Sequence, residues 1–185
     1  PNEEKIKEHF FLDDYNKLNL LNNIKLNLTT ITPRLLYPGC GCDILFPLIY
    51  LEKLFPKIKV ANFIFVDSSN NLPNIKTILD SVGVGFSEDK NKISFYWKNI
   101  FVNLTFVNMR IEDIFQQIKP IDIYFERAFR IMRERIVGYE KVIVEKLNPS
   151  GILISDSGFT EQNLQFIEVL KKLSSYEEMV IGVKK

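Results

Sequence analysis

The sequence predicts an α/β fold: a doubly wound, mostly parallel sheet that carries a β-hairpin insertion and an N-terminal helix. From residue 34 onward, short apolar runs alternate with longer segments of helical periodicity. Several of the short runs are apolar at consecutive positions, which is typical of strands covered by helices on both faces. Because strand, helix and strand follow one another repeatedly, right-handed crossovers would wind them into one parallel sheet.

Five short apolar runs are the expected parallel strands, and helical segments separate them. We expect the strands at residues 35–37, 62–66, 101–107, 121–125 and 152–155, and the helices at residues 44–55, 72–82, 112–118 and 131–147. Residues 93–97 and 100–105 are both rich in β-forming side chains and flank the pair Lys98-Asn99. This pattern predicts a hairpin attached to the third strand.

The two ends of the chain complete the expected organisation. Residues 3–21 place apolar side chains roughly on one helical face, which predicts an amphipathic helix packed on the body of the protein. A connector follows to residue 33, and the core is expected at 34–160. We expect a C-terminal helix at 161–174 and a last strand at 179–184, so that residues 1–185 form one domain.

Composition excludes several classes of protein. With 24 Lys and Arg against 23 Asp and Glu, the net charge of +1 argues against nucleic acid or an anionic membrane as the main partner. The apolar runs are shorter than the roughly 20 residues of a membrane-spanning helix, and the N-terminus does not resemble a secretory signal. The use of only two cysteines fits a reducing compartment, so we expect a cytoplasmic protein. Two cysteines and the single His9 are too few for a structural zinc site, so no metal is expected.

The most informative stretch runs from Arg34 to Asp43, where an apolar strand leads through a Gly-X-Gly turn into a helix. Ligands of open α/β sheets bind at the carboxyl ends of the strands, and Gly39 and Gly41 let the main chain approach a ligand closely. Asp43 can cap the following helix. Because Ile44 stands where a dinucleotide motif has its third glycine, and no P-loop ending follows, the pattern favours a nucleoside-type ligand without a pyrophosphate.

Residues 34–160 resemble the class I S-adenosylmethionine-dependent methyltransferases. The resemblance rests on this Gly-X-Gly turn, on the acidic end of the second strand, and on residues 146–155, which are similar to the family's Leu-X-Pro-X-Gly turn before its fifth strand. It implies that S-adenosylmethionine is bound by Tyr37, Pro38, Gly39, Cys40, Gly41 and Asp43 after the first strand, by Asp67 and Ser68 after the second, and by Arg110, Ile111 and Glu112 after the third.

The chain departs from the family pattern at three of these positions. Tyr37 stands where the family usually has an acidic residue, and Asp43 where it usually has a small one. Arg110 stands where an acidic residue often receives the exocyclic amine of adenine, and a guanidinium cannot accept a hydrogen bond. Glu112 or Asp113 remains as an acceptor, and the Ile111 N–H remains as a donor to a ring nitrogen.

Asp67 is the position at which the residues themselves support the resemblance. A carboxylate at the end of a strand can accept hydrogen bonds from two ribose hydroxyls, and these are strengthened by its charge. The alternative is that Asp67 only caps a turn with Ser68 and Ser69. We favour the ribose role.

The end of the fourth strand supplies the candidate for catalysis. Glu126 is the expected catalytic residue, acting as a general base during methyl transfer. Two alternatives stay open: Glu126 could bind the methionine amine of the cofactor, or it could pair with Arg130 on a helix surface. Arg127 and Asp156 are the expected substrate-binding residues. The arginines at 127, 130, 133 and 135 favour an anionic substrate if they line the crevice, but their helical spacing favours a solvated surface.

The predicted function is therefore an S-adenosylmethionine-binding methyltransferase of unknown acceptor, which is a small molecule or a protein. The alternative is a non-catalytic relative that acts as a cofactor sensor or protein-interaction module. A homo-oligomer, in which a second subunit completes the acceptor site, also stays open.

Overall fold

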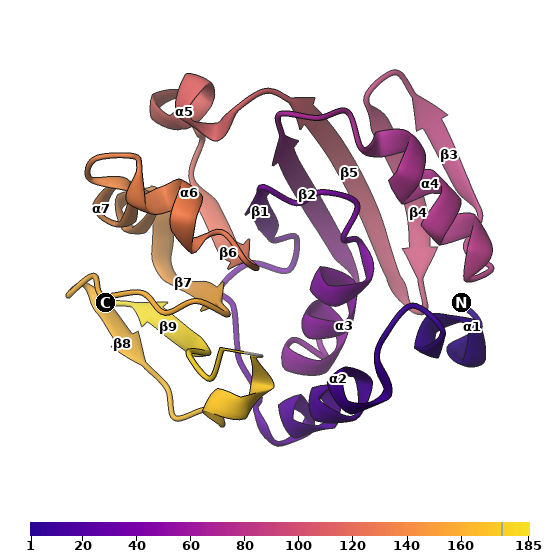
Figure 1. Cartoon of the computed structure of the whole chain (residues 1–185), viewed down its shortest axis with the longest axis horizontal. Coiled ribbons are helices and arrows are strands. Elements are labelled where there is room, and N and C mark those ends of the chain that lie inside the picture. Colours follow the sequence, from indigo (N-terminus) through magenta and orange to yellow (C-terminus); the bar gives the residue numbers. More distant parts are fainter. Residues whose placement is uncertain (175) are drawn as a thin grey trace.

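The computed structural model describes residues 1–174 and 176–185 and is organised around a nine-stranded sheet (Figure 1). The strands are β1 (Arg34–Pro38), β2 (Val60–Asp67), β3 (Phe86–Asp89), β4 (Lys92–Trp97), β5 (Ile100–Asn108), β6 (Ile121–Glu126), β7 (Leu147–Ser155), β8 (Leu164–Phe166) and β9 (Val180–Lys184). The α-helices are α1 (Glu3–Lys7), α2 (Leu12–Lys17), α3 (Leu45–Leu54), α4 (Leu72–Ser81), α5 (Ile111–Ile114), α6 (Arg130–Glu134) and α7 (Tyr139–Lys146), and the 3₁₀ helices are η1 (Leu18–Asn23), η2 (Phe115–Gln117) and η3 (Lys171–Leu173). Among the described helices, none has the length and apolar character needed to span a bilayer.

The strand order is β3-β4-β5-β2-β1-β6-β7-β9-β8, and the five strands from β5 to β7 are parallel. Leu36 of β1 pairs with Ile64 of β2 on one side and with Tyr124 of β6 on the other. The chain thus moves outward in both directions from β1, and such a switch point opens a crevice at the carboxyl ends of the central strands. The α/β fold class and the hairpin, formed by β4 and β5, are confirmed.

Side chains of β1 alternate between two apolar layers. Leu35 and Tyr37 belong to the layer under α3 and α4, whereas Leu36 belongs to the layer under α7. Figure 1 shows α6 and α7 beside β6 and β7, α2 below α3, and α1 below α4. Both faces of β1 and β6 are buried, as residues 35–37 and 121–125 predicted.

The expectation that helices bury both faces of every parallel strand is wrong for β2 and β5. Their side chains alternate between buried and half-buried positions. The segment between β5 and β6 contains only the four-residue α5 and the turn η2, so it covers little of that face. The half-buried positions accordingly include polar side chains that satisfy each other: Asn103 Nδ2 donates to Asn62 Oδ1 at 3.3 Å.

The helix expected at residues 3–21 is divided into α1, α2 and η1. Because of this division, the segment at α1 and the segment at η1 contact different helices of the body. The Asn2 N–H donates to the Val82 carbonyl at the end of α4 (2.7 Å), whereas η1 packs on α3. Phe10 lies between α1 and α2, and the centre of its ring is 4.8 Å from the centre of the Phe46 ring.

Two further helix predictions need correction. Residues 131–147 form α6 and α7 rather than one helix, and Gly138 with φ of 71° stands at the N-terminus of α7 in a left-handed conformation that helix interiors do not contain. The helix expected at 161–174 is wrong: Leu164–Phe166 pairs with β9 as a strand, and only η3 is helical. The strand expected at 179–184 is confirmed as β9.

Replacing Gly151 by alanine should destabilise the fold by roughly 1–3 kcal/mol, because the added Cβ would lie 2.7 Å from the Asn148 carbonyl oxygen and 3.2 Å from that of Asp122. Gly85→Ala is the matched control, since nothing lies within 4 Å of its added Cβ, and its effect should stay within about 0.5 kcal/mol. Urea denaturation measures both. Equal stabilities of the two variants would contradict this account of β7.

Candidate functional site

Six of the predicted cofactor residues come from three separate strand ends and line one cavity of about 250 Å³, here called cavity A. The six are Gly39 after β1, Asp67 and Ser68 at the end of β2, and Arg110, Ile111 and Glu112 after β5. Val66, Met109, Ala128, Phe129 and Met132 complete its lining. Parallel strands bring these segments together because their carboxyl ends lie at one edge of the sheet.

The other predicted cofactor residues do not line cavity A, and two of them, Cys40 and Asp43, line a separate cavity of about 360 Å³. Tyr37 is buried, and its hydroxyl donates to Asp43 Oδ2 at 2.8 Å. Asp43 also accepts the Phe46 N–H at 3.2 Å, which confirms the predicted cap of α3. Pro38 ends β1, and burial raises the pKa of the Cys40 thiol, so this sulfur stays protonated.

Asp67 joins the glycine loop to β2. Its Oδ2 accepts the Gly41 N–H and its Oδ1 accepts the Ser69 N–H, both at 2.8 Å. The turn-capping alternative is therefore present in the structure. Since each carboxylate oxygen has two lone pairs, both oxygens can still accept a further hydrogen bond.

Gly39 has a specific steric reason to be glycine. Its φ is +59°, and a Cβ at this position would lie 2.5 Å from Cδ2 of Phe129. The Phe129 ring therefore fills the space directly beside the Gly-X-Gly turn. Sequence reasoning missed Phe129 and Met132, because an apolar residue outside a recognised motif carries no signal of a site.

The turn after β6 is strained at Ala128, which has a left-handed φ of 50° without being glycine. The Ala128 N–H donates to both carboxylate oxygens of Asp156, at 2.9 and 3.1 Å. Ala128 lines cavity A and also a second cavity of about 180 Å³, here called cavity B. Strained backbone that is held in place by side chains is typical of functional sites.

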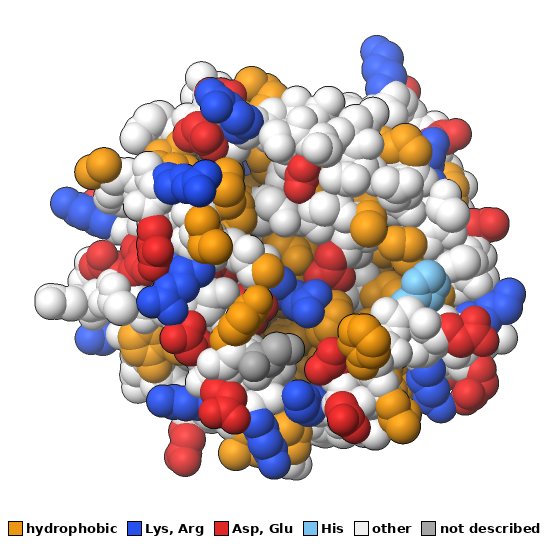
Figure 2. All heavy atoms as spheres, in the orientation of Figure 1, with side chains coloured by type: hydrophobic (Ala, Val, Ile, Leu, Met, Phe, Trp, Pro, Cys, Tyr) orange, Lys and Arg blue, Asp and Glu red, His pale blue; other side chains and the backbone are white. Residues whose placement is uncertain are grey.

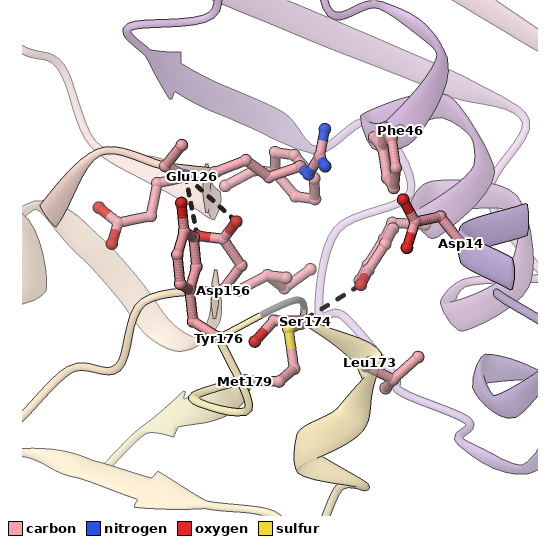
Figure 3. Close-up of a pocket in the computed structure, with 13 residues that line it drawn as sticks. Asp14, Phe46, Glu126, Asp156, Leu173, Ser174, Tyr176 and Met179 are labelled. Atoms are coloured by element: carbon pink, nitrogen blue, oxygen red, sulfur yellow. Dashed lines mark hydrogen bonds between the residues drawn. The ribbon is translucent and has the colours of Figure 1, made fainter. Parts of the chain in front are cut away.

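Cavity B contains both predicted substrate residues, Arg127 and Asp156. Its other lining residues are Asp14, Phe46, Tyr50, Phe125, Glu126, Ala128, Ile154, Leu173, Ser174, Tyr176 and Met179. Figure 3 shows Asp156 and Tyr176 on one side of it, and Asp14 and Phe46 on the other. Arg127 Nη1 lies 3.0 Å from Asp43 Oδ2, and its guanidinium lies 3.3 Å above the centre of the Phe46 ring.

Glu126 is fully buried, and its carboxylate points away from cavity B (Figure 3). It pairs with Arg133 and accepts hydrogen bonds from Tyr124 Oη and Ser155 Oγ, each at 2.6 Å. Burial raises the pKa of Glu126 to about 7, and Arg133 and the two hydroxyls oppose this rise. The catalytic role of Glu126 stays a prediction, and the structure adds a positioning role between β6, β7 and α6.

The pairing of Glu126 with Arg130 is wrong. Arg130 instead pairs with Glu134 at 2.9 Å and with Glu178 at 2.8 Å. The solvated-surface interpretation of the arginines is also wrong for Arg133, which is 5% exposed.

Arg110 lines cavity A with an exposed side chain and pairs with Asp113 at 3.3 Å, so Asp113 is engaged with Arg110. No cluster of metal-ligating side chains occurs within residues 1–174 and 176–185.

Comparison with known proteins gives a likeness of fold. No family model and no curated protein sequence matches the chain. Among solved structures, TehB from Haemophilus influenzae matches with a TM-score of 0.51 and 12% identity, over 95% of this chain and 63% of TehB. TrmN from Thermus thermophilus matches with a TM-score of 0.48 and 11% identity, over 93% and 48% of the two chains. The plantazolicin methyltransferase BpumL, in complex with SAH, matches with a TM-score of 0.42 and 12% identity, over 83% and 48%.

The chain thus spans between about half and just under two thirds of the length of these proteins. The match to TehB, together with the strand order, shows a class I methyltransferase-like fold, as the sequence predicted. At such low identity the comparison concerns the fold alone, and function has to be argued from the site.

Glu126→Gln should remove one pH-dependent contribution to stability. Because the pKa of Glu126 is raised from 4.5 to about 7, the folded chain holds a proton that the unfolded chain releases in this range. The contribution of Glu126 to the free energy of unfolding is full below pH 4.5 and is lost as the pH rises to 7. Over this range the free energy of unfolding changes by at most about 1.4 kcal/mol per pH unit. Denaturation curves of wild type and variant between pH 4 and 8 measure it, and a constant difference over this range would contradict it.

Proposed function

We propose that the chain binds S-adenosylmethionine in cavity A and transfers its methyl group to an acceptor bound in cavity B. The observation that carries this proposal is the convergence of Gly39, Asp67 and Ser68, and residues 110–112 on one cavity from three strand ends. Ala128 lines both cavities. A cofactor and an acceptor in these cavities would therefore lie on either side of one short turn.

The lining of cavity A suits a nucleoside. Met109, Ile111 and Met132 offer apolar surface to a flat base, and Ile111 is the first residue of α5, so its N–H has no intrahelical acceptor. Asp67 presents its carboxylate to a ribose. The bound cofactor would supply a methyl group on a positively charged sulfur as the electrophile.

The remaining residues of the site would position these parts. Asp156 holds the turn at Ala128 through two hydrogen bonds, and Asp67 holds the glycine loop through Gly41. Glu126 fixes the end of β6 against α6 through Arg133. Positioning accounts for a large share of the rate of bimolecular group transfer, since it converts the reaction into an effectively unimolecular one.

One arrangement favours the second candidate function, a non-catalytic module with this fold. The Phe129 ring packs against Gly39, and the Asp43–Arg127 ion pair joins the glycine loop to the turn after β6. These side chains occupy the space beside the Gly-X-Gly turn that the methionine part of the cofactor would need. Transfer requires that they move when the cofactor binds.

Isothermal titration of the full chain with S-adenosylhomocysteine and S-adenosylmethionine tests the proposal. Asp67→Asn removes the charge and turns one of the two oxygens that accept the Gly41 and Ser69 N–H groups into a donor, so the affinity should fall by about 10- to 150-fold, the equivalent of roughly 1.5–3 kcal/mol for a charged hydrogen bond. The matched control is Asp80→Asn, which removes an exposed carboxylate on α4. Its affinity should equal that of wild type.

The outcomes separate the two candidate functions. Absence of heat with either ligand at millimolar concentration would favour the non-catalytic module. Binding that Asp67→Asn leaves unchanged would remove Asp67 from the ribose site.

A further inference from the structure

We propose that cavity B binds a small organic amine in its ammonium form, and that this amine is the methyl acceptor. The second half of this statement rests on the proposed function, whereas the first half rests on cavity B alone. Charge, aromatic surface and size each support it.

The charges around cavity B leave it negative. Arg127 is paired with Asp43 at 3.0 Å, so these two charges cancel locally, and Arg133, which pairs with Glu126, does not line cavity B. Asp156 has no ion-pair partner within the described part of the chain, since its oxygens accept only from Ala128 N–H and Ser157 Oγ.

Asp14, on the opposite side of cavity B, adds a second negative charge. Its Oδ1 lies 3.6 Å from Lys17 Nζ, and both side chains are about one-third exposed (35% each), so this pair is weak. An anionic ligand would be repelled by Asp14 and Asp156, whereas an ammonium group would gain from both carboxylates.

The walls of cavity B add aromatic surface. Phe46, Tyr50, Phe125 and Tyr176 line it, and the face of an aromatic ring attracts cations. The site already holds one such contact, because the Arg127 guanidinium lies 3.3 Å from the centre of the Phe46 ring. Figure 2 shows the same combination at the surface: a hollow near the middle of this face contains hydrophobic side chains next to charged ones.

The size of cavity B limits the ligand. Its volume of about 180 Å³ is smaller than the 250 Å³ of cavity A, to which the larger cofactor is assigned. The ligand is therefore compact, with a charged nitrogen and a short apolar body. Tyr176 is 66% exposed, so it contributes to the cavity without being part of the core.

The chemistry of the acceptor follows from its nitrogen. The ammonium first releases one proton to solvent, and the lone pair so exposed forms the new N–C bond to the methyl carbon. The C–S bond of the cofactor breaks, and its electron pair stays on sulfur as a neutral thioether. The products are a methylated ammonium, S-adenosylhomocysteine and the released proton, so atoms and charge balance.

Three probes of the same size test the charge preference by titration of the full chain, followed by NMR: benzylamine, benzyl alcohol and benzoate. We expect benzylamine to bind at least about tenfold more tightly than the alcohol, and benzoate to bind most weakly. Asp156→Asn keeps an acceptor for the Ala128 N–H but should abolish the preference for the amine. Tyr176→Ala, an exposed position that leaves the fold intact, should weaken benzylamine binding, and Asp80→Asn should leave it unchanged.

Failure of this proposal is distinct from failure of the proposed function. If S-adenosylhomocysteine binds but benzylamine binds no better than benzoate, the amine site is wrong and the methyltransferase proposal stands. If benzylamine binds with the expected preference but neither cofactor form binds, the amine site stands and its role as acceptor is overturned. Mass spectrometry of benzylamine incubated with S-adenosylmethionine should show a gain of one methyl group, and its absence with both ligands bound would also overturn that role.

Discussion

Burial of the central strands determines where polar chemistry can occur in this protein. Both faces of β1 and β6 are covered, and their charged side chains, Arg34, Asp122 and Glu126, lie at or next to the ends of the strands. An unpaired polar group in such strands would lose its hydrogen bonds to water without replacement. Carboxylates, arginines and glycines therefore gather where the strands end, and the switch point between β1 and β6 brings those ends together.

The two buried carboxylates of β6 show how strict this constraint is. Asp122, near the start of the strand, accepts the Arg34 N–H and Asn148 Nδ2, each at 2.8 Å, and so connects β6 to both neighbouring segments. Glu126, at the other end, has Arg133 and two hydroxyl donors. A buried ion pair of this kind is weak evidence for stability, but loss of one partner leaves a costly charge behind. Each carboxylate thus fixes the register of β6 at one end.

The sequence was sufficient for the parts of the fold that depend on short-range pattern. Apolar runs located the five parallel strands, and residue type at their ends located cavity A, because strand ends converge in this topology. The features that the sequence did not predict depend on interactions between segments that are distant in the chain. The apolar spacing at residues 161–174 suits a helix, but pairing of Leu164–Phe166 with β9 overrides it. Glu126 pairs seven residues ahead rather than four because the chain turns at Ala128 before α6 begins at Arg130.

The position of β9 has a consequence for synthesis of the protein. It lies between β7 and β8, and both of these neighbours precede it in the chain. On the ribosome, residues 156 to 179 must be made after β7 before its partner exists, which takes about one to five seconds at roughly 5–20 residues per second. During that interval the edge of β7 that later pairs with β9 has main-chain groups without a strand partner, and such an edge can pair with another chain.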